Sequence, residues 1–262
     1  MPSGKQSKRR RQVAQAPAPP SRTRRQASPR VLIAAGAVVA LIVIGIVLGV
    51  VLIGGGSDDG SSSATAPKLP DARDVQQMFA GIPQHDNVLG DVSAAVTMIE
   101  YVDLQCPYCQ QFETLAMPSV ISSYVRKGKV KVEVRPIAFI GVDSQRGRAA
   151  LLAAGMQNKL FNFMQLIYDN QGAENTSWLN DDLIKSAGAS IPGLDVDRLL
   201  SDRNSKAVED RSGSIDAQGV RDGVKSTPTI LVGKTGTKPK LVTLTSASDS
   251  ATVGTAIDAA MS

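Results

Sequence analysis

The sequence contains two cysteines, Cys106 and Cys109, which are separated by two residues. An apolar run from Val96 to Val102 precedes them, and apolar residues at helical spacing follow. A Cys-x-x-Cys pair at the junction of a strand and a helix is typical of thiol-disulfide exchange. We therefore interpret this pair as the reactive centre of the chain.

The neighbours of the pair suit this chemistry. Exchange requires a thiolate, whereas an ordinary thiol with a pKa of about 8.5 is mostly protonated at neutral pH. The first turn of a helix lowers a thiol pKa, because its unpaired N–H groups and its dipole stabilise the anion. Pro107 favours that position for Cys106, since proline suits the first helical residue. We expect Cys106 to be the exposed attacking thiol and Cys109, one turn deeper, to resolve the mixed disulfide.

Other uses of two cysteines fit less well. A zinc site usually takes four ligands, and His85, the one histidine of the sequence, is distant from the pair and is expected to have a surface or capping role. A purely structural disulfide across two residues closes a very short loop and stabilises little. Two buried free thiols would be unusual outside the cell. We expect no metal and no cofactor beyond the Cys106–Cys109 disulfide itself.

Thr227-Pro228 is a second candidate element, directly before the apolar run Thr229 to Val232. Proline is tolerated at the start of a strand, so a simple turn-to-strand junction is one interpretation. The other is a cis proline beside the Cys pair, where an extended substrate could pair with the backbone.

The remaining pattern predicts an α/β fold. Strands are expected at 96–103 and 129–140, and again at 229–232 and 241–244, with a final helix at 250–261. Alternation along the first strand places Glu100 and Val102 on one face and Ile99, Tyr101 and Asp103 on the other. Pro118 should kink the helix that follows the cysteines. A short helix is expected at 71–80.

The segment of about residues 144–222 reads as a helical insertion. Apolar residues from Ala149 to Ile167 predict one amphipathic helix that ends near Gly172. A second helix is expected at 177–187, and Asp195 and Asn204 are suitable N-caps for a third and a fourth.

The first 57 residues differ in charge from the rest. They contain nine Lys or Arg and no acidic residue, which leaves 20 basic and 24 acidic residues after them, a net charge of about −4. The basic character of the whole chain, +5, thus belongs to a tail, and no basic stripe with aromatics follows. We expect no nucleic-acid partner. Residues 1–30, rich in Pro, Ala and Arg, are expected to be disordered.

Residues 31–53 lack charged side chains and, as a helix of ~34 Å, would span a ~30 Å hydrocarbon core. A cleaved signal peptide is the alternative, but no suitable cleavage site follows closely. We expect a retained single transmembrane helix. The basic tail then stays in the cytoplasm and the rest lies outside. Residues 54–84 are expected to form a flexible linker, and residues 85–262 the catalytic domain at the outer face of the cell membrane.

Two segments together resemble the DsbA family of bacterial thiol-disulfide oxidoreductases: Glu100 to Cys109 and Gly223 to Thr229. The resemblance covers about residues 85–262. It implies a thioredoxin-like fold with an inserted helical subdomain and a cis Thr227-Pro228 bond against the active site. It also implies that the substrates are reduced, unfolded exported proteins and that a quinone-linked membrane protein reoxidises the pair.

Within this resemblance, Cys106 matches the nucleophile, Cys109 the resolving cysteine and Glu100 an acidic residue that assists proton transfer. For Glu100 a solvated strand charge is the alternative. Tyr108 stands where the family usually has histidine, and Ser226 where glycine is usual. Since Pro-Tyr also occurs in glutaredoxin-type reductants, a reductase or isomerase is an alternative to a dithiol oxidase. A non-catalytic thioredoxin-like binding module is the third hypothesis.

Overall fold

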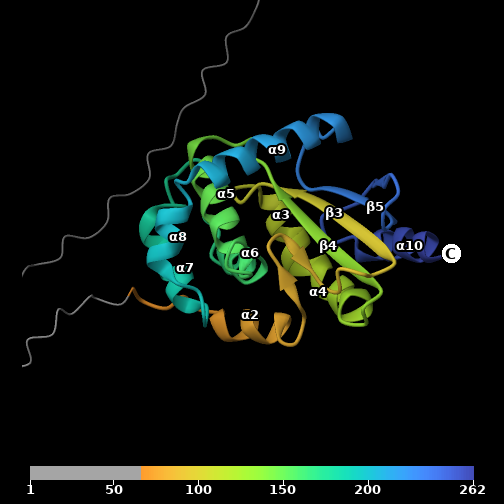
Figure 1. Cartoon of the computed structure of the whole chain (residues 1–262), viewed down its shortest axis with the longest axis horizontal. Helices are drawn as coiled ribbons and strands as arrows, with labels where there is room; N and C mark the ends of the chain where they lie inside the picture. Colours follow the sequence, from red (N-terminus) through yellow and green to blue (C-terminus); the bar gives the residue numbers. More distant parts are fainter. Residues whose placement is uncertain (1–65) are drawn as a thin grey trace, which may run out of the picture. The chain divides into compact units, whose positions relative to one another are not determined.

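The computed structural model describes residues 66–262, which form an α/β fold around one mixed sheet (Figure 1). The six strands of this part follow the order β1-β2-β4-β3-β5-β6. Their bounds are Gln84–His85, Val88–Leu89, Val96–Val102, Val130–Pro136, Thr229–Lys234 and Lys240–Val242 for β1 to β6. The four longer ones confirm the predicted strands, whereas the two-residue strands β1 and β2 were not expected. His85, expected at the surface, is exposed in β1.

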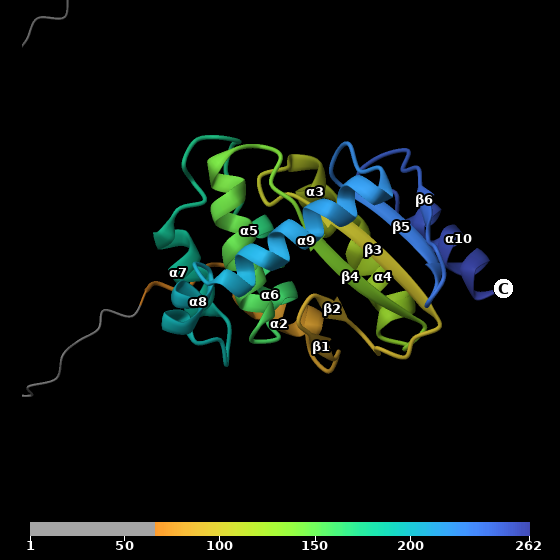
Figure 2. The same ribbon diagram turned by 45° about the horizontal axis from the view of Figure 1, so that its top comes forward.

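The central strand β3 runs parallel to β4 and antiparallel to β5. Helices α3 (Pro107–Gln111), α4 (Met117–Val120) and α10 (Ser250–Met261) lie on one face of the sheet, and α9 (Lys206–Asp222) crosses the other face (Figure 2). Because β3 is covered on both faces, its residues from Met98 to Val102 are all buried. The side chains of this strand therefore point into the interior whichever face they take.

The chain after the cysteines alternates between two helix types. Helix α3 (Pro107–Gln111) continues as a π-helical turn, Phe112–Ala116, then as α4 (Met117–Val120) and a second π-helical turn, Ile121–Val125. Pro118 has no N–H to donate to the preceding turn, so the regular α-helical bonding is interrupted there. The sequence predicted a distortion at Pro118 but not the π-helical turns.

The helical insertion consists of α5 to α9. Their bounds are Val142–Gly155, Leu160–Asp169, Asp181–Ser190, Val196–Asp202 and Lys206–Asp222. The single helix expected from Ala149 to Ile167 is wrong, because the chain turns between α5 and α6. Asn158 has φ 58° at this turn, and its Oδ1 accepts a hydrogen bond from the N–H of Asp86 at 2.9 Å. Asp195 caps α8 as expected, whereas Ser205, not Asn204, caps α9.

Helix α2 (Ala72–Phe79) confirms the short helix predicted near Asp71. It also corrects the linker expected at 54–84, since the helix is part of the folded unit. Val75 and Phe79 are buried, and the Phe79 ring lies 6.3 Å from that of Phe161 on α6. The amphipathic pattern of α2 drives this packing, so the fold begins before residue 85.

The predicted disordered tail and transmembrane helix, residues 1–30 and 31–53, lie outside the described residues. Among the helices of residues 66–262, none has the length and apolar character needed to cross a bilayer.

Candidate active site

Cys106 is the N-cap of α3, and Pro107 occupies its first turn, as the sequence predicts. The thiols are less accessible than expected: Cys106 is 5% exposed and Cys109 is fully buried. Both are free thiols in this structure. Tyr108 between them is 63% exposed. The expectation of an exposed Cys106 is therefore corrected, although it remains the more accessible thiol of the two.

The segment around Thr227-Pro228 covers Cys106 and explains its low exposure. The Thr227-Pro228 peptide bond is cis, as the resemblance implies. The Cys106 Sγ lies 3.3 Å from the carbonyl oxygen of Thr227, to which it can donate a weak hydrogen bond while it is protonated. Residues 121 positions apart in the chain thus meet at one site, and the backbone before Pro228 is placed beside the attacking sulfur.

The two thiols have opposite acid strengths. A hydrogen bond from the Cys109 thiol, followed by Thr227 and by the backbone N–H groups of Cys109 and Tyr108, lowers the pKa of Cys106 to about 6. Burial raises the pKa of Cys109 well above its ordinary value. At neutral pH Cys106 is therefore a thiolate and Cys109 a thiol, as an attacking and a resolving cysteine need to be.

Glu100 and Glu113 form a pair of buried carboxyls, 0% and 1% exposed. Burial, and then the charge of Glu113, raises the pKa of Glu100 well above its ordinary value. Burial also raises the pKa of Glu113 to about 7. Both oxygens of Glu100 lack a hydrogen-bond partner of ordinary geometry among the described residues. The interpretation of Glu100 as a solvated charge is therefore wrong, and the pair retains a proton at neutral pH.

Tyr168 on α6 is affected by the charges of both the thiols and the carboxyls. Its side chain is fully buried, and its hydroxyl donates to the carbonyl oxygen of Asp103 at 3.1 Å. Burial raises the pKa of Tyr168 well above its ordinary value, and the charges of Cys109, Glu113, Glu100 and Cys106 add to the effect. Tyr168 thus lies within electrostatic reach of both the thiols and the carboxyls, and we refer to these five side chains together as the buried cluster.

The helical insertion holds the loop that leads to Cys106. Gln171, just after α6, donates to the carbonyl oxygens of Leu104 at 2.9 Å and Cys106 at 3.2 Å. Ser144 on α5 donates to the Asp103 carboxylate at 2.6 Å. That carboxylate also accepts the N–H groups of Gln105, Phe139 and Ile140. The insertion therefore fixes the approach to α3.

The predicted site residues separate into two groups. Cys106, Pro107, Tyr108 and Cys109 at the start of α3 meet Thr227-Pro228, and only Tyr108 is well exposed, whereas Glu100 belongs to the buried carboxyl pair. Glu113, Tyr168 and Asp103 were missed. Glu113 carried one available signal, because it stands seven residues after Cys106 on the same helical segment, and two helical turns bring it to the same side.

The groups at this site have complementary acid strengths. Within residues 66–262, no three His, Cys, Asp or Glu side chains gather in a way that suits a metal ion. The site combines a largely covered thiolate, a protonated partner thiol and a buried carboxyl pair that retains a proton. These are the requirements of reversible disulfide exchange.

Comparisons with known proteins agree with this geometry. Residues 84–258 match the model of a family described as thioredoxin. The chain is 30% identical over 159 residues to a protein of Bacillus cereus named probable disulfide bond formation protein D. This match covers 60% of the chain and 73% of that protein.

Solved structures share the fold at lower identity. BdbD from Bacillus subtilis, in its oxidised form, superposes with a TM-score of 0.59 and 20% identity, over 69% of this chain and 96% of that one. The α-DsbA1 protein of Wolbachia pipientis gives a TM-score of 0.55 and 22% identity, over 66% and 89% of the two chains. Both likenesses concern the fold.

Proposed function

Because the chain belongs to the thioredoxin family and is a DsbA-like thiol-disulfide oxidoreductase, we propose that it is a dithiol oxidase that introduces disulfides into exported proteins. The observation that carries this direction is the low pKa of Cys106 beside the high pKa of Cys109. A stabilised thiolate favours the reduced pair, so the oxidised pair tends to give its disulfide away.

The reaction proceeds in two exchanges. A client thiolate attacks the Cys106 Sγ of the disulfide, the S–S bond to Cys109 breaks, and a mixed disulfide with Cys106 forms. A second client thiolate attacks the client sulfur, and Cys106 leaves as a thiolate, which its pKa of about 6 favours. The client loses two electrons, and the Cys pair gains them.

The buried carboxyls supply a proton to Cys109. This sulfur leaves the disulfide as an anion, yet burial raises its pKa well above the ordinary value, so it must be protonated. Glu100 and Glu113 hold a proton at neutral pH within the same cluster. We assign to Glu100 the transfer of the proton to Cys109, and to Glu113 the role of sharing that proton with Glu100. On reoxidation the proton returns from Cys109 by the reverse route.

Clients bind at the backbone of Thr227 and Pro228, as an extended chain beside Cys106. Pro107 and Tyr108 tune the thiolate and flank the entry. Reduced or unfolded proteins suit this arrangement, because an exposed Cys with free backbone on either side reaches a sulfur that is only 5% exposed.

The proposed location is the cell membrane. Residues 31–53 anchor the chain by one pass, residues 1–30 stay in the cytoplasm, and the catalytic domain lies outside. Reoxidation there is assigned to a quinone-linked membrane oxidoreductase. Protease added to intact spheroplasts should digest the domain but leave the basic tail, and alkaline carbonate should not extract the chain. Release by carbonate would contradict the anchor.

The reduction potential of the Cys106/Cys109 pair tests the direction. Equilibration of the full chain with glutathione is expected to give a value nearer to about −120 mV, typical of a strong oxidant, than to about −270 mV, typical of a reductant. Cys106→Ser should abolish oxidation of a reduced client, and the absence of any reversible couple would remove every enzymatic function.

A reductase or isomerase is the second candidate, because Tyr108 stands beside the nucleophile. A potential near −250 mV or lower would support it. If the protein with both cysteines changed to serine kept its full biological function, the chain would instead be a binding module.

A further inference from the structure

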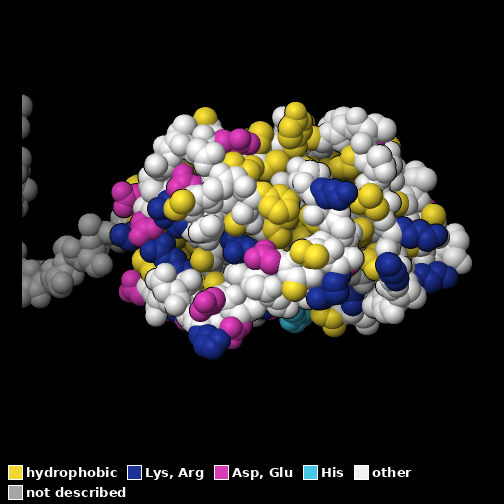
Figure 3. Space-filling view, turned by 90° about the horizontal axis from the view of Figure 1, so that it is seen from above, with side chains coloured by type: hydrophobic (Ala, Val, Ile, Leu, Met, Phe, Trp, Pro, Cys, Tyr) yellow, Lys and Arg dark blue, Asp and Glu magenta, His cyan; other side chains and the backbone are white. Residues whose placement is uncertain are grey.

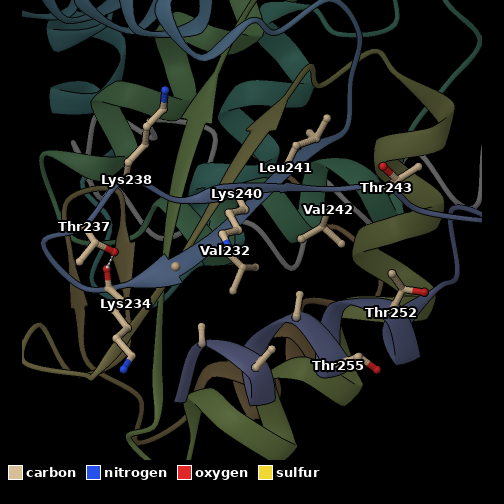
Figure 4. A pocket seen from close by; sticks show the side chains of 14 residues that line it. Val232, Lys234, Thr237, Lys238, Lys240, Leu241, Val242, Thr243, Thr252 and Thr255 are labelled. Carbon is tan, nitrogen blue, oxygen red and sulfur yellow. Dashed lines mark hydrogen bonds between the residues drawn. The ribbon is translucent and has the colours of Figure 1, made fainter. Parts of the chain in front are cut away.

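A cavity of about 520 Å³ lies between α10 and the β5–β6 ribbon (Figure 4). Its volume falls within the ~300–1,000 Å³ of small-molecule sites. Its lining follows the β5–β6 pair from Lys234, at the end of β5, to Val242, which pairs with Ile230 two residues after Pro228. None of the residues that line it belongs to the cysteine site.

The floor of the cavity is apolar and made of small side chains. Val232 and Val242 contribute from the sheet, and Ala256, Ala259 and Ala260 from α10. A hydrocarbon chain would cover these groups and remove apolar surface from water.

The rim of the cavity is cationic. Lys234, Lys238 and Lys240 line it, with the Lys238 side chain directed away from α10, and no acidic residue lines it (Figure 4). Among the residues that the structure describes, none of the three has a carboxylate within 4.0 Å. Lysine places its ammonium at the water boundary while its stem lies along apolar surface.

The two acidic residues at the start of α10 and within it are already engaged. Asp249 caps α10 by accepting the N–H of Thr252 at 2.9 Å. Asp258 accepts the hydroxyl of Tyr124 at 3.2 Å. In the view of Figure 3, acidic side chains gather towards the α7–α8 end, whereas Lys and Arg dominate the end that carries α10. The cavity thus opens where the local charge is positive.

We propose that this cavity binds a free, single-chain anionic amphiphile, such as a long-chain carboxylate. The carboxylate would meet the lysines, and the chain would lie against the valines and alanines. A peptide added to the sheet edge fits less well, because β6 has three residues and follows Pro239, which has no N–H to donate.

A photoreactive probe tests the proposal in the full chain, held in nanodiscs of zwitterionic lipid. The probe is a 12-carbon carboxylate with a diazirine near its apolar end, and mass spectrometry locates the labels. Labels are expected on residues 241–262 and on β5. Free dodecanoate should reduce them at least fivefold, whereas dodecanol and dodecyltrimethylammonium should not.

Two variants and a matched control sharpen the result. Lys234→Gln/Lys238→Gln/Lys240→Gln and the cavity-filling Ala259→Phe should each lower labelling at least fivefold. Lys127→Gln/Lys129→Gln/Lys185→Gln, which removes three lysines outside the cavity, should leave it unchanged. Melting curves verify that each variant is folded.

Three results would overturn the proposal: equal competition by dodecanol, labelling that persists in both cavity variants, or labels confined to other segments. Suppression by nanodiscs that contain phosphatidylglycerol, without competition by dodecanoate, would assign the cavity to a lipid headgroup and would also overturn it. Client oxidation should be unaffected by these variants, so the outcome does not depend on the proposed oxidase function.

Discussion

The thiol of Cys109 has a direct part in activating Cys106. Its hydrogen bond is the largest of the contributions that lower the pKa of Cys106 to about 6, ahead of Thr227 and of the backbone N–H groups. The resolving cysteine thus stabilises the anion that forms when Cys106 leaves the client sulfur. Helix position alone, which the sequence suggested as the cause, accounts for the smaller part.

Cys109→Ala should therefore raise the pKa of Cys106 towards its ordinary 9.0, because the donor is removed. The pKa can be measured from the thiolate absorbance at 240 nm or from the pH dependence of alkylation. Cys109→Ser keeps a donor of similar size and should preserve most of the lowering. An unchanged pKa in the alanine variant would assign the effect to the backbone of α3.

The buried carboxyl pair makes stability depend on pH. In the folded chain Glu113 keeps its proton up to a pH of about 7, whereas an exposed glutamate loses it near 4.5. The folded state therefore binds more protons in this window, and its stability decreases as the pH rises from 4.5 to 7.

Glu113→Gln removes that decrease. At pH 8 the variant should be more stable than the parent by on the order of 1–3 kcal/mol, and at pH 4 the two should differ little. Urea denaturation at both pH values measures this, with the exposed Glu209→Gln as control. If the variant were less stable than the parent at pH 8, the ionised Glu113 side chain would stabilise the folded state, contrary to this prediction.

At the scale of elements, the end of α9 is tied to the sheet beside the active site. Tyr101 on β3 donates to Asp222 at 2.7 Å, and Arg135 on β4 donates to both, at 2.9 and 3.0 Å. Asp222 is the last residue of α9, and Gly223 follows with φ 72°. The segment that leads to Thr227 starts from this anchor.

Asp222→Asn should destabilise the fold by about 1–2 kcal/mol, because it weakens charge-assisted hydrogen bonds that are mostly shielded from water. Asp216, also on α9, is 52% exposed and forms an ion pair with Arg148 on α5. Asp216→Asn breaks this pair and should cost less than about 1 kcal/mol. Denaturant midpoints compare the two. Equal losses would contradict an anchoring role for Asp222.

The sequence predicted elements whose signal is local. The strands β3, β4 and β5 and the helix α10 follow from apolar runs and turn residues. The break between α5 and α6 could not be found in this way, since the apolar repeat continues across it and the turn depends on Asn158 meeting Asp86. Likewise the burial of Glu100 and Glu113 arises from packing on both faces of β3, whereas a glutamate in a sequence suggests an exposed side chain.

At the scale of the whole molecule, α2 joins the N-terminal side of the domain to the insertion. Phe79→Ala should destabilise the fold by about 3–5 kcal/mol, because it empties a buried site against Phe161. Arg73→Ala on the exposed side of the same helix should change little. Thermal melting distinguishes the two variants. A small loss of stability in Phe79→Ala would mean that α2 belongs to the linker and not to the folded domain.

Redox state and folding are linked through Cys106. In the reduced fold the pKa of Cys106 falls from 9.0 to about 6, which stabilises that fold. The oxidised protein has no thiolate and therefore lacks this stabilisation. At pH 7 the reduced fold gains about 1.4 kcal/mol from this anion, equivalent to about 30 mV in the potential of the pair. The gain is smaller than the full change in pKa implies, since an ordinary thiol is still protonated at pH 7.

The stability of the reduced protein relative to the oxidised one should therefore increase with pH between about 6 and 8.5. In this window the unfolded reduced chain binds more protons than the folded one, and stability rises with pH. Above about 9 the trend should reverse, because buried Cys109 stays protonated in the folded chain while the unfolded thiol ionises. Denaturation of both redox forms across this range measures the difference. A flat difference would mean that the thiolate of Cys106 does not drive the oxidation of clients.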